Sequence, residues 1–220
     1  MKKVLLMGDD IHFSYEERVK ELLADVCEVI SDPCNARYTA NALWLVRDQI
    51  ELTMQLKDID LIHWNTGLWD HYRTMDDGAP LVSAEHYLYY NRRYHRQLAS
   101  YADRLIWATT TPAGDGYPYD PNDIYGIPKD EWNREVTLYN DLLIPYLKHE
   151  GVVINDLHAL VSANPDYLSE DGIHLSDKGA EAAAQQTAAM IRELLNTELG
   201  EGAKKEQTRR DSDEACRFNW

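Results

Sequence analysis

The sequence is poor in cysteine and in basic residues, and each shortage excludes a class of protein. It has three cysteines in 220 residues, with no C-x-x-C spacing, so we expect reduced thiols rather than a disulfide framework. Lysine and arginine total 22 against 38 aspartates and glutamates, which gives a formal net charge of −16. A field of that sign repels phosphate backbones and anionic lipids, so nucleic acid and membrane surfaces are not expected as partners.

Long apolar runs are also missing. The N-terminus MKKVLLMGDD has a basic start, but its apolar run, Val4 to Met7, is too short for a signal-peptide core. No later segment is long enough to span a bilayer, so we expect a cytoplasmic location. The 44% hydrophobic content is that of a globular chain, and 220 residues suffice for one well-buried α/β domain.

Short apolar runs alternate with segments of helical periodicity. Strands are expected at 3–7, 27–30, 60–64, 104–110 and 151–156, with a loop after the last. Helices are expected over 14–26, 39–57, 83–101, 129–149 and 176–197, with Ser14 and Thr39 capping the first two. Because parallel neighbours need a helical crossover, this alternation predicts a three-layer α/β/α fold with a five-stranded parallel sheet. We expect this domain to span 1–198, followed by a flexible charged tail over 199–220.

Ligands of open parallel sheets bind at the carboxyl ends of the strands. That rule brings together GDDIH (8–12), DPCNAR (32–37), NTGLWD (65–70) and EDGIHLSDKG (170–179). In the last segment Asp171 stands three residues before His174. This spacing lets the carboxylate hold one ring nitrogen and leaves the other free as a general base. Alone it is a weak signal, because a lone loop histidine is more often structural or simply exposed.

In this order the segments resemble the blocks of the SGNH hydrolases, also called GDSL-type esterases and lipases, over about residues 1–197. The resemblance implies a flavodoxin-like strand order, hydrolase activity and no cofactor. The fifth block of that family, D-x-x-H, is intact as Asp171 and His174. The first block is G-D-S in the family, with serine as nucleophile, and here it is Gly8-Asp9-Asp10. Asp10 therefore takes the nucleophile position, while Asp9 is expected to cap the turn that follows.

Two further blocks depart from the family pattern. The glycine of the second block, whose backbone N–H helps bind the oxyanion, corresponds to Ala36. The third block, usually G-x-N-D, is Gly67-Leu68-Trp69-Asp70, and Asn65 is the substitute for its missing asparagine. The resemblance thus implies a set of oxyanion or substrate-binding residues: Asn65, Ala36, Asn35, Arg37, Gly67, Trp69 and Asp70.

An aspartate at position 10 excludes ordinary serine-esterase chemistry, because attack by its carboxylate on an acyl carbon would give a mixed anhydride. Three interpretations stay open. Asp10 attacks a saturated carbon, such as an anomeric centre, and water activated by His174 hydrolyses the resulting ester. Alternatively, Asp10 is a general base or an electrostatic stabiliser. In the third, catalysis is lost and the site binds a ligand without turnover. A serine esterase in which Asp10 has replaced the nucleophilic serine is a further alternative that fits the same sequence.

Aromatic residues in the loops suit a carbohydrate ligand, although packing of the loops explains them equally well. They are Trp64, Trp69, Tyr72, Tyr117, Tyr119, Tyr125 and Trp132. Arg37 and Arg73 can bind a carboxylate or sugar hydroxyl, or be paired internally. We expect a hydrolase of a small polar substrate, with an acylated or glycosidic sugar as the candidate. The alternative is a catalytically inactive binding protein on the same fold. No strong metal-ligand spacing occurs, so no metal is expected.

Overall fold

The computed structural model describes residues 1–74, 77–120 and 126–197. Its strands are β1 Lys2–Met7, β2 Cys27–Ser31, β3 Leu61–Asn65, β4 Arg104–Ala108 and β5 Val153–Asn155. They form one parallel sheet in the order β2-β1-β3-β4-β5. The predicted α/β class, parallel sheet and flavodoxin-like order are confirmed. The predicted tail over 199–220 and the loop residue Tyr125 lie outside the described residues.

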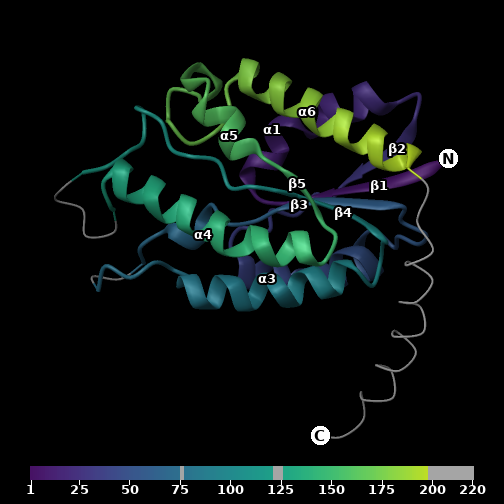
Figure 1. The fold of residues 1–220 in the computed structure, drawn as a ribbon, viewed down its shortest axis with the longest axis horizontal. Helices are drawn as coiled ribbons and strands as arrows, with labels where there is room; N and C mark the ends of the chain where they lie inside the picture. Colours follow the sequence, from purple (N-terminus) through teal and green to yellow (C-terminus); the bar gives the residue numbers. More distant parts are fainter. Residues whose placement is uncertain (75–76, 121–125, 198–220) are drawn as a thin grey trace, which may run out of the picture.

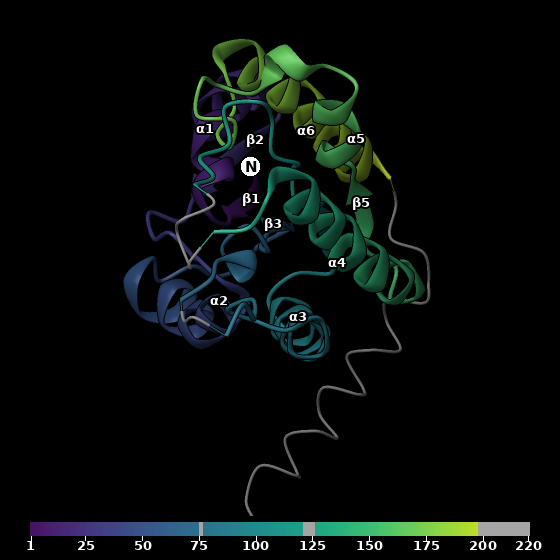
Figure 2. The same ribbon diagram turned by 90° about the vertical axis from the view of Figure 1, so that its left-hand side faces the viewer.

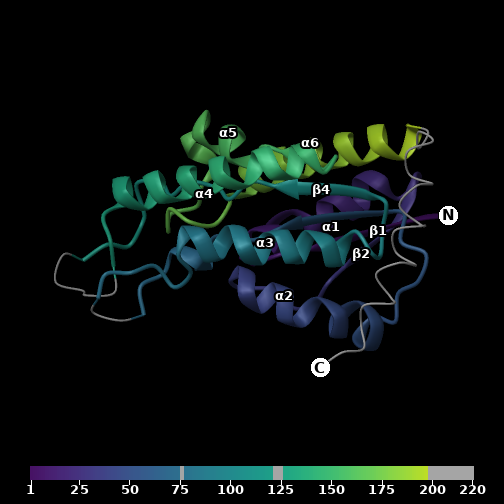
Figure 3. The same cartoon turned by 60° about the horizontal axis from the view of Figure 1, so that its bottom comes forward.

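Helices cover both faces of the sheet (Figures 1 and 2). One face carries α1 Asp10–Leu23, α5 Leu157–Ser162 and α6 Asp177–Asn196. The other carries α2 Thr39–Arg47, α3 Ala84–Leu98 and α4 Lys129–His149, and Figure 3 shows α3 alongside both α2 and α4. Among the described residues, no helix combines the length and apolar character needed to cross a membrane.

The continuous apolar run of β1 is explained by this double cover. Val4 and Leu6 pack in the core beneath α1 and α6, whereas Leu5 and Met7 pack in the core beneath α2, α3 and α4. All four side chains are at most 2% exposed. Successive side chains of a strand point to opposite faces, so a strand covered on both faces needs apolar residues at every position.

The two predicted helix caps, Ser14 and Thr39, are wrong, and so is the predicted start of the first helix. Helix α1 begins at Asp10 and not at Ser14, because Asp9 is the N-cap and accepts a hydrogen bond from the Ile11 N–H. The predicted capping role of Asp9 is thereby confirmed. Thr39 is the first residue of α2 rather than its cap, and its N–H and hydroxyl both donate to Asp70.

Two other helical segments differ from the prediction. The single helix expected over 39–57 is α-helical only to Arg47 and continues as a π-helix, η1 Asp48–Thr53. Residues 157–162, expected in a loop, form α5, because Asp156 caps them by accepting a hydrogen bond from the Ala159 N–H. The expected helix over 129–149 is α4, with the same bounds.

Candidate active site

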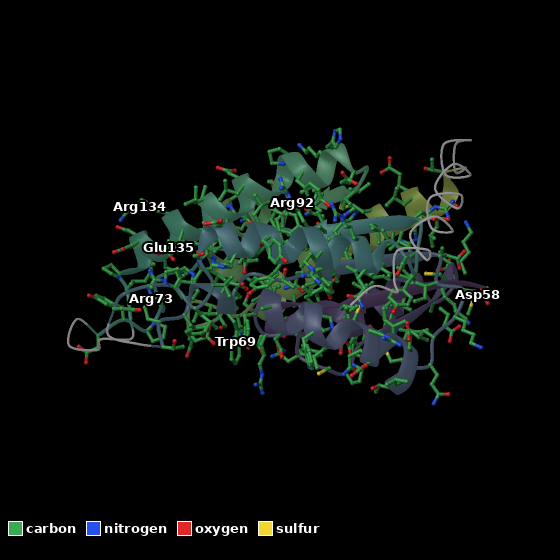
Figure 4. All side chains as sticks on the ribbon, turned by 90° about the horizontal axis from the view of Figure 1, so that it is seen from below. Asp58, Trp69, Arg73, Arg92, Arg134 and Glu135 are labelled. Atoms are coloured by element: carbon green, nitrogen blue, oxygen red, sulfur yellow. The ribbon has the colours of Figure 1, made fainter. Side chains whose placement is uncertain are left out.

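The candidate site lies at the carboxyl edge of the sheet. The turn into α1 follows β1, the loop 32–37 follows β2, and the short 3₁₀ helix η2 (Trp69–His71) follows β3. Figure 4 shows Trp69 at this end of the molecule, with Arg73 and Glu135, and Asp58 at the opposite end. The sheet therefore brings to one edge the segments that the sequence separates by up to 160 residues.

The turn from β1 into α1 is held by Asp9, which is 1% exposed. Its carboxylate accepts hydrogen bonds from the N–H of Ile11 at 3.2 Å, from Asn65 Nδ2 at 2.5 Å and from the N–H of Leu68 at 3.4 Å. A Cβ at Gly8 would overlap Asn65 Oδ1, so only glycine fits beneath the amide. Burial raises the pKa of Asp9 to about 6, and these donors limit the rise.

Asp10 is half-buried and both of its oxygens accept a hydrogen bond. Asn35 Nδ2 donates to Oδ1 at 2.5 Å, and Trp69 Nε1 donates to Oδ2 at 2.5 Å. Asn35 is fixed in turn, because its Oδ1 accepts the N–H of Arg37 at 2.7 Å. Arg37 has a left-handed backbone, with φ of 57°, and its guanidinium lies 5.8 Å from the centre of the Trp69 ring. The Asp10 side chain is thus anchored from two separate loops.

His174 and Asp171 form a hydrogen-bonded dyad. His174 Nδ1 lies 2.7 Å from Asp171 Oδ2, and the two side chains are 46% and 49% exposed. Asp171 Oδ1 also accepts the N–H groups of Ile173 and His174 and the hydroxyl of Ser169. Burial opposes ionisation, but these donors outweigh it and hold the pKa of Asp171 well below its usual range. The carboxylate therefore stays ionised and leaves Nε2 of His174 for proton transfer.

The loop that carries the dyad packs on the loop after β4. The N–H of Gly114 donates to the carbonyl of Gly172 at 2.7 Å. Gly172 has φ of +68°, and a Cβ there would overlap the backbone nitrogen of Tyr117. Glycine at 172 is therefore required both by the backbone and by the close approach of the two loops.

A series of aromatic rings connects the Asp10 side of the site to the dyad loop. Successive ring centres are 5.5 Å apart for Trp69 and Tyr72, 5.6 Å for Tyr72 and Trp132, and 5.2 Å for Trp132 and Tyr117. The pKa of the Tyr72 hydroxyl is raised by burial and then by the charges of Asp10 and Asp171. Tyr72 therefore lies within the field of both carboxylates, which places Asp10 and the dyad around one aromatic surface.

The structure divides the predicted site residues into two groups. Asp10, Asn35, Arg37, Trp69, Asp171 and His174 are exposed or half-exposed, whereas Asn65, Ala36, Gly67 and Asp70 are buried. Only the first group is accessible to a ligand. The residues of the second group hold the loops that present the first group.

The predicted anion donors Asn65 and Ala36 are buried and make contacts inside the fold. Asn65 Nδ2 donates one of its two N–H groups to Asp9, and the N–H of Ala36 donates to the carbonyl of Gly8 at 2.9 Å. Their role in anion binding stays a prediction. Asp70 is committed to Thr39. Gly67 has φ of +134°, and a Cβ there would overlap the hydroxyl of Thr110, so this glycine is required by the backbone.

Internal pairing, one of the two alternatives given for Arg73, is what the structure shows, although its partner Glu135 was not predicted. Arg73, whose side chain is 3% exposed, donates to both oxygens of Glu135, at 2.5 and 3.0 Å (Figure 4). Arg73 is thus internally paired rather than free for substrate. Burial opposes ionisation of Glu135, but donors from His71 and Arg73 lower its pKa to about 2. No sequence spacing links residues 62 positions apart. Within the described ranges, no group of three or more His, Cys, Asp or Glu is arranged to hold a metal ion.

The sequence was compared with family models and with curated proteins. No protein-family model matches the chain. An acetylxylan esterase of Xylanibacter ruminicola is 38% identical over 68 residues, which is 29% of this chain but only 14% of that protein's length. The local match therefore covers a minor part of both proteins.

Solved structures match over most of the chain. A lipase/acylhydrolase from Enterococcus faecalis has a TM-score of 0.70 at 16% identity, covering 91% of this chain and 100% of the other. An acetyl xylan esterase has a TM-score of 0.65 at 16% identity, covering 86% and 99%. The aryl esterase of M. smegmatis has a TM-score of 0.70 at 13% identity, covering 88% and 100%. The chain has the SGNH hydrolase fold, as the sequence predicted.

Proposed function

We propose that this protein hydrolyses ester bonds of small acylated carbohydrates, with His174 as general base and Asp171 as its partner. The observation that carries the proposal is the 2.7 Å contact between His174 Nδ1 and Asp171 Oδ2, on a half-exposed loop at the carboxyl edge of the sheet. Support for the ester bond comes from the structural neighbours, which include an acylhydrolase and an acetyl xylan esterase. The local match to an acetylxylan esterase supports a sugar ester.

The anchoring of Asp10 favours water over the aspartate as the nucleophile. Both oxygens of Asp10 accept short hydrogen bonds, which stabilise the carboxylate and lower its nucleophilicity. In this mechanism Asp10 supplies a fixed negative charge that stabilises the imidazolium of His174. Ordinary serine-esterase chemistry is excluded by the residue itself.

The reaction then has two proton transfers. His174 Nε2 takes a proton from water while the water oxygen bonds to the acyl carbon. The tetrahedral intermediate collapses, the bond from carbon to the sugar oxygen breaks, and the imidazolium returns its proton to that oxygen. The products are a carboxylic acid and the free sugar hydroxyl. Exposed Tyr72, whose ring contacts that of Trp69, offers a ring face beside the site on which a sugar can stack.

A second candidate is a binding protein without turnover. It is favoured by the same anchoring, since an Asp10 carboxylate held by Asn35 and Trp69 is occupied in the resting protein. In a third candidate function, Asp10 attacks a saturated carbon of a glycoside. This reaction requires the carboxylate to break its hydrogen bonds with Asn35 and Trp69.

Activity assays on variants separate these candidates. The native protein, Asp10→Ser and His174→Ala are assayed against acetylated sugars and aryl glycosides, with exposed His149 at the far end of α4 replaced by alanine as the control. The proposal expects native esterase activity that falls about 100-fold or more in His174→Ala and not in His149→Ala. Activity only in Asp10→Ser would mean a disabled serine site, and no turnover by any form with sugar binding retained would favour the binding protein.

Isotope labelling identifies the nucleophile. A single turnover in ¹⁸O-labelled water is followed by mass spectrometry of the peptide that contains Asp10. Direct attack by water leaves the peptide unlabelled, because all of the label enters the acid product. Attack by Asp10 on the acyl carbon would form a mixed anhydride, and hydrolysis of that anhydride at the aspartyl carbonyl would leave ¹⁸O in the peptide; such a label would refute the mechanism proposed above.

A further inference from the structure

We propose that Asn35 Nδ2 and Trp69 Nε1 form an anion-binding pair for small carboxylates, and that the Asp10 carboxylate fills this pair in the native protein. The inference rests on the proposed function in one respect only, because it takes the surroundings of Asp10 as the place where substrate binds. It concerns two donors other than Asn65 and Ala36, which donate to Asp9 and to the carbonyl of Gly8 inside the fold.

The two donors are held in position by contacts that do not involve Asp10. Asn35 presents Nδ2 because its Oδ1 accepts the N–H of Arg37 at 2.7 Å. Trp69 lies in η2, and its ring contacts the guanidinium of Arg37 and the ring of Tyr72. A donor pair fixed in this way keeps its spacing when the side chain at position 10 changes, which is the condition for a pre-formed site.

The chemistry of the pair selects a carboxylate. Each N–H donates to a different oxygen of Asp10, so the pair matches a ligand with two acceptor oxygens on one carbon. An indole N–H has no acceptor function, and Asn35 has its only acceptor oxygen engaged by Arg37. Asp10 is also the first residue of α1, where the helix N-terminus favours negative charge. The neighbouring Asp9 carboxylate accepts hydrogen bonds from three other N–H groups, those of Ile11, Asn65 and Leu68.

Filling of the pair has a consequence for the native site. A free carboxylate, including the acid that an ester hydrolase releases, finds both donors taken and meets the negative charge of Asp10. The native protein is therefore expected to resist inhibition by acetate and to reject anionic substrates. Removing the Asp10 side chain beyond Cβ opens the pair to an external carboxylate.

Acetate binding to Asp10→Ala tests the proposal without any need for turnover. Acetate is titrated at pH 7 and constant ionic strength, and binding is followed by calorimetry and by the indole N–H resonance of Trp69, assigned with Trp69→Phe. We expect a millimolar Kd for Asp10→Ala, at least about 10-fold tighter than for the native protein. Asp10→Asn is the volume-matched control, because its amide occupies the same space although its one oxygen can accept from only one of the two donors. Acetamide is the neutral control ligand, with at least about 10-fold weaker binding expected.

Double variants locate the donors. Adding Trp69→Phe or Asn35→Ala to Asp10→Ala should weaken acetate binding by about 10-fold or more each, since a hydrogen bond to a charged group is lost. The proposal is overturned if folded Asp10→Ala binds acetate no better than the native protein, if acetamide binds equally, or if both double variants keep full affinity. Circular dichroism checks folding, and Asp10→Ser takes the place of Asp10→Ala if the alanine variant is unfolded. Failure of the esterase assay leaves these binding results unaffected, so the two proposals fail separately.

Discussion

The buried carboxyl of Asp70 should make the stability of this protein depend on pH in a direction opposite to that of a salt-bridged aspartate. Asp70 is fully buried, and it accepts the N–H and hydroxyl of Thr39. Burial raises its pKa from 3.8 to about 7. Between these values the native state keeps a proton that the unfolded state has lost. The stabilisation is therefore present at low pH and is lost as the pH rises through about 7.

The size of the effect follows from the linkage between protonation and folding. From pH 5 to pH 8 the unfolded Asp70 is already ionised, while the native group gives up its proton, which lowers the free energy of unfolding by about 2–3 kcal/mol. Asp70→Asn removes this term, because an amide stays neutral and its oxygen still accepts from Thr39. The difference in unfolding free energy, Asp70→Asn minus native, should rise by about 2–3 kcal/mol over that range.

Urea unfolding at pH 5, 6, 7 and 8, followed by tryptophan fluorescence, measures the difference. Comparing two proteins cancels groups with the opposite slope, such as His63, whose pKa burial lowers to about 3. Asp130→Asn, in the exposed first turn of α4, is the control for loss of one surface carboxylate. A difference that stays flat with pH, or falls, would refute the assignment of a raised pKa to Asp70.

Three further predictions concern the dyad, a turn and the ion pair. Asp171→Asn should lower kcat/KM for ester hydrolysis by about 100-fold with little change in KM, since the imidazole loses its charged partner and not its substrate contacts; steady-state kinetics tests this. Gly67→Ala should lower the unfolding free energy by about 2–4 kcal/mol, because φ of +134° and the Thr110 hydroxyl both oppose a Cβ. Chemical denaturation measures this loss, and a loss below about 0.5 kcal/mol would disprove the prediction. Arg73→Ala should cost about 2–4 kcal/mol of unfolding free energy by removing the charged partner of Glu135 and leaving it only the contact with His71, and Arg73→Lys should cost less. Equal melting temperatures for all three proteins would contradict the buried pair.

The strands could be predicted from the sequence because their signal is local. The run Val4 to Met7 is apolar at every position, and only a strand covered on both faces requires that. The start of α1 could not be predicted from periodicity, since the first turn carries Asp10 and His12 among its residues. The π-helical end of the segment after Arg47 also gave no signal, because its apolar spacing fits an α-helix equally well.

The candidate site was predictable where its partners are neighbours in the chain. Asp171 and His174 are three residues apart, so the spacing itself indicates the contact. Asn65 and Asp9 are 56 residues apart, and the choice of Asn65 as an anion donor depended on its position in a motif. Whether an amide points into the site or into the fold depends on what is packed beside it, and a single sequence does not contain that information.

The turn that precedes α1 is held by Gly8, Asp9 and Asn65, while the contacts of Asp10 are with Asn35 and Trp69. The residue that folds the turn and the residue that faces the ligand are thus adjacent but independent. A change of side chain at position 10 can alter the chemistry of this edge without removing a bond that shapes the backbone. Evolution, and equally a protein engineer, can therefore exchange the side chain at position 10 while the turn that presents it stays the same.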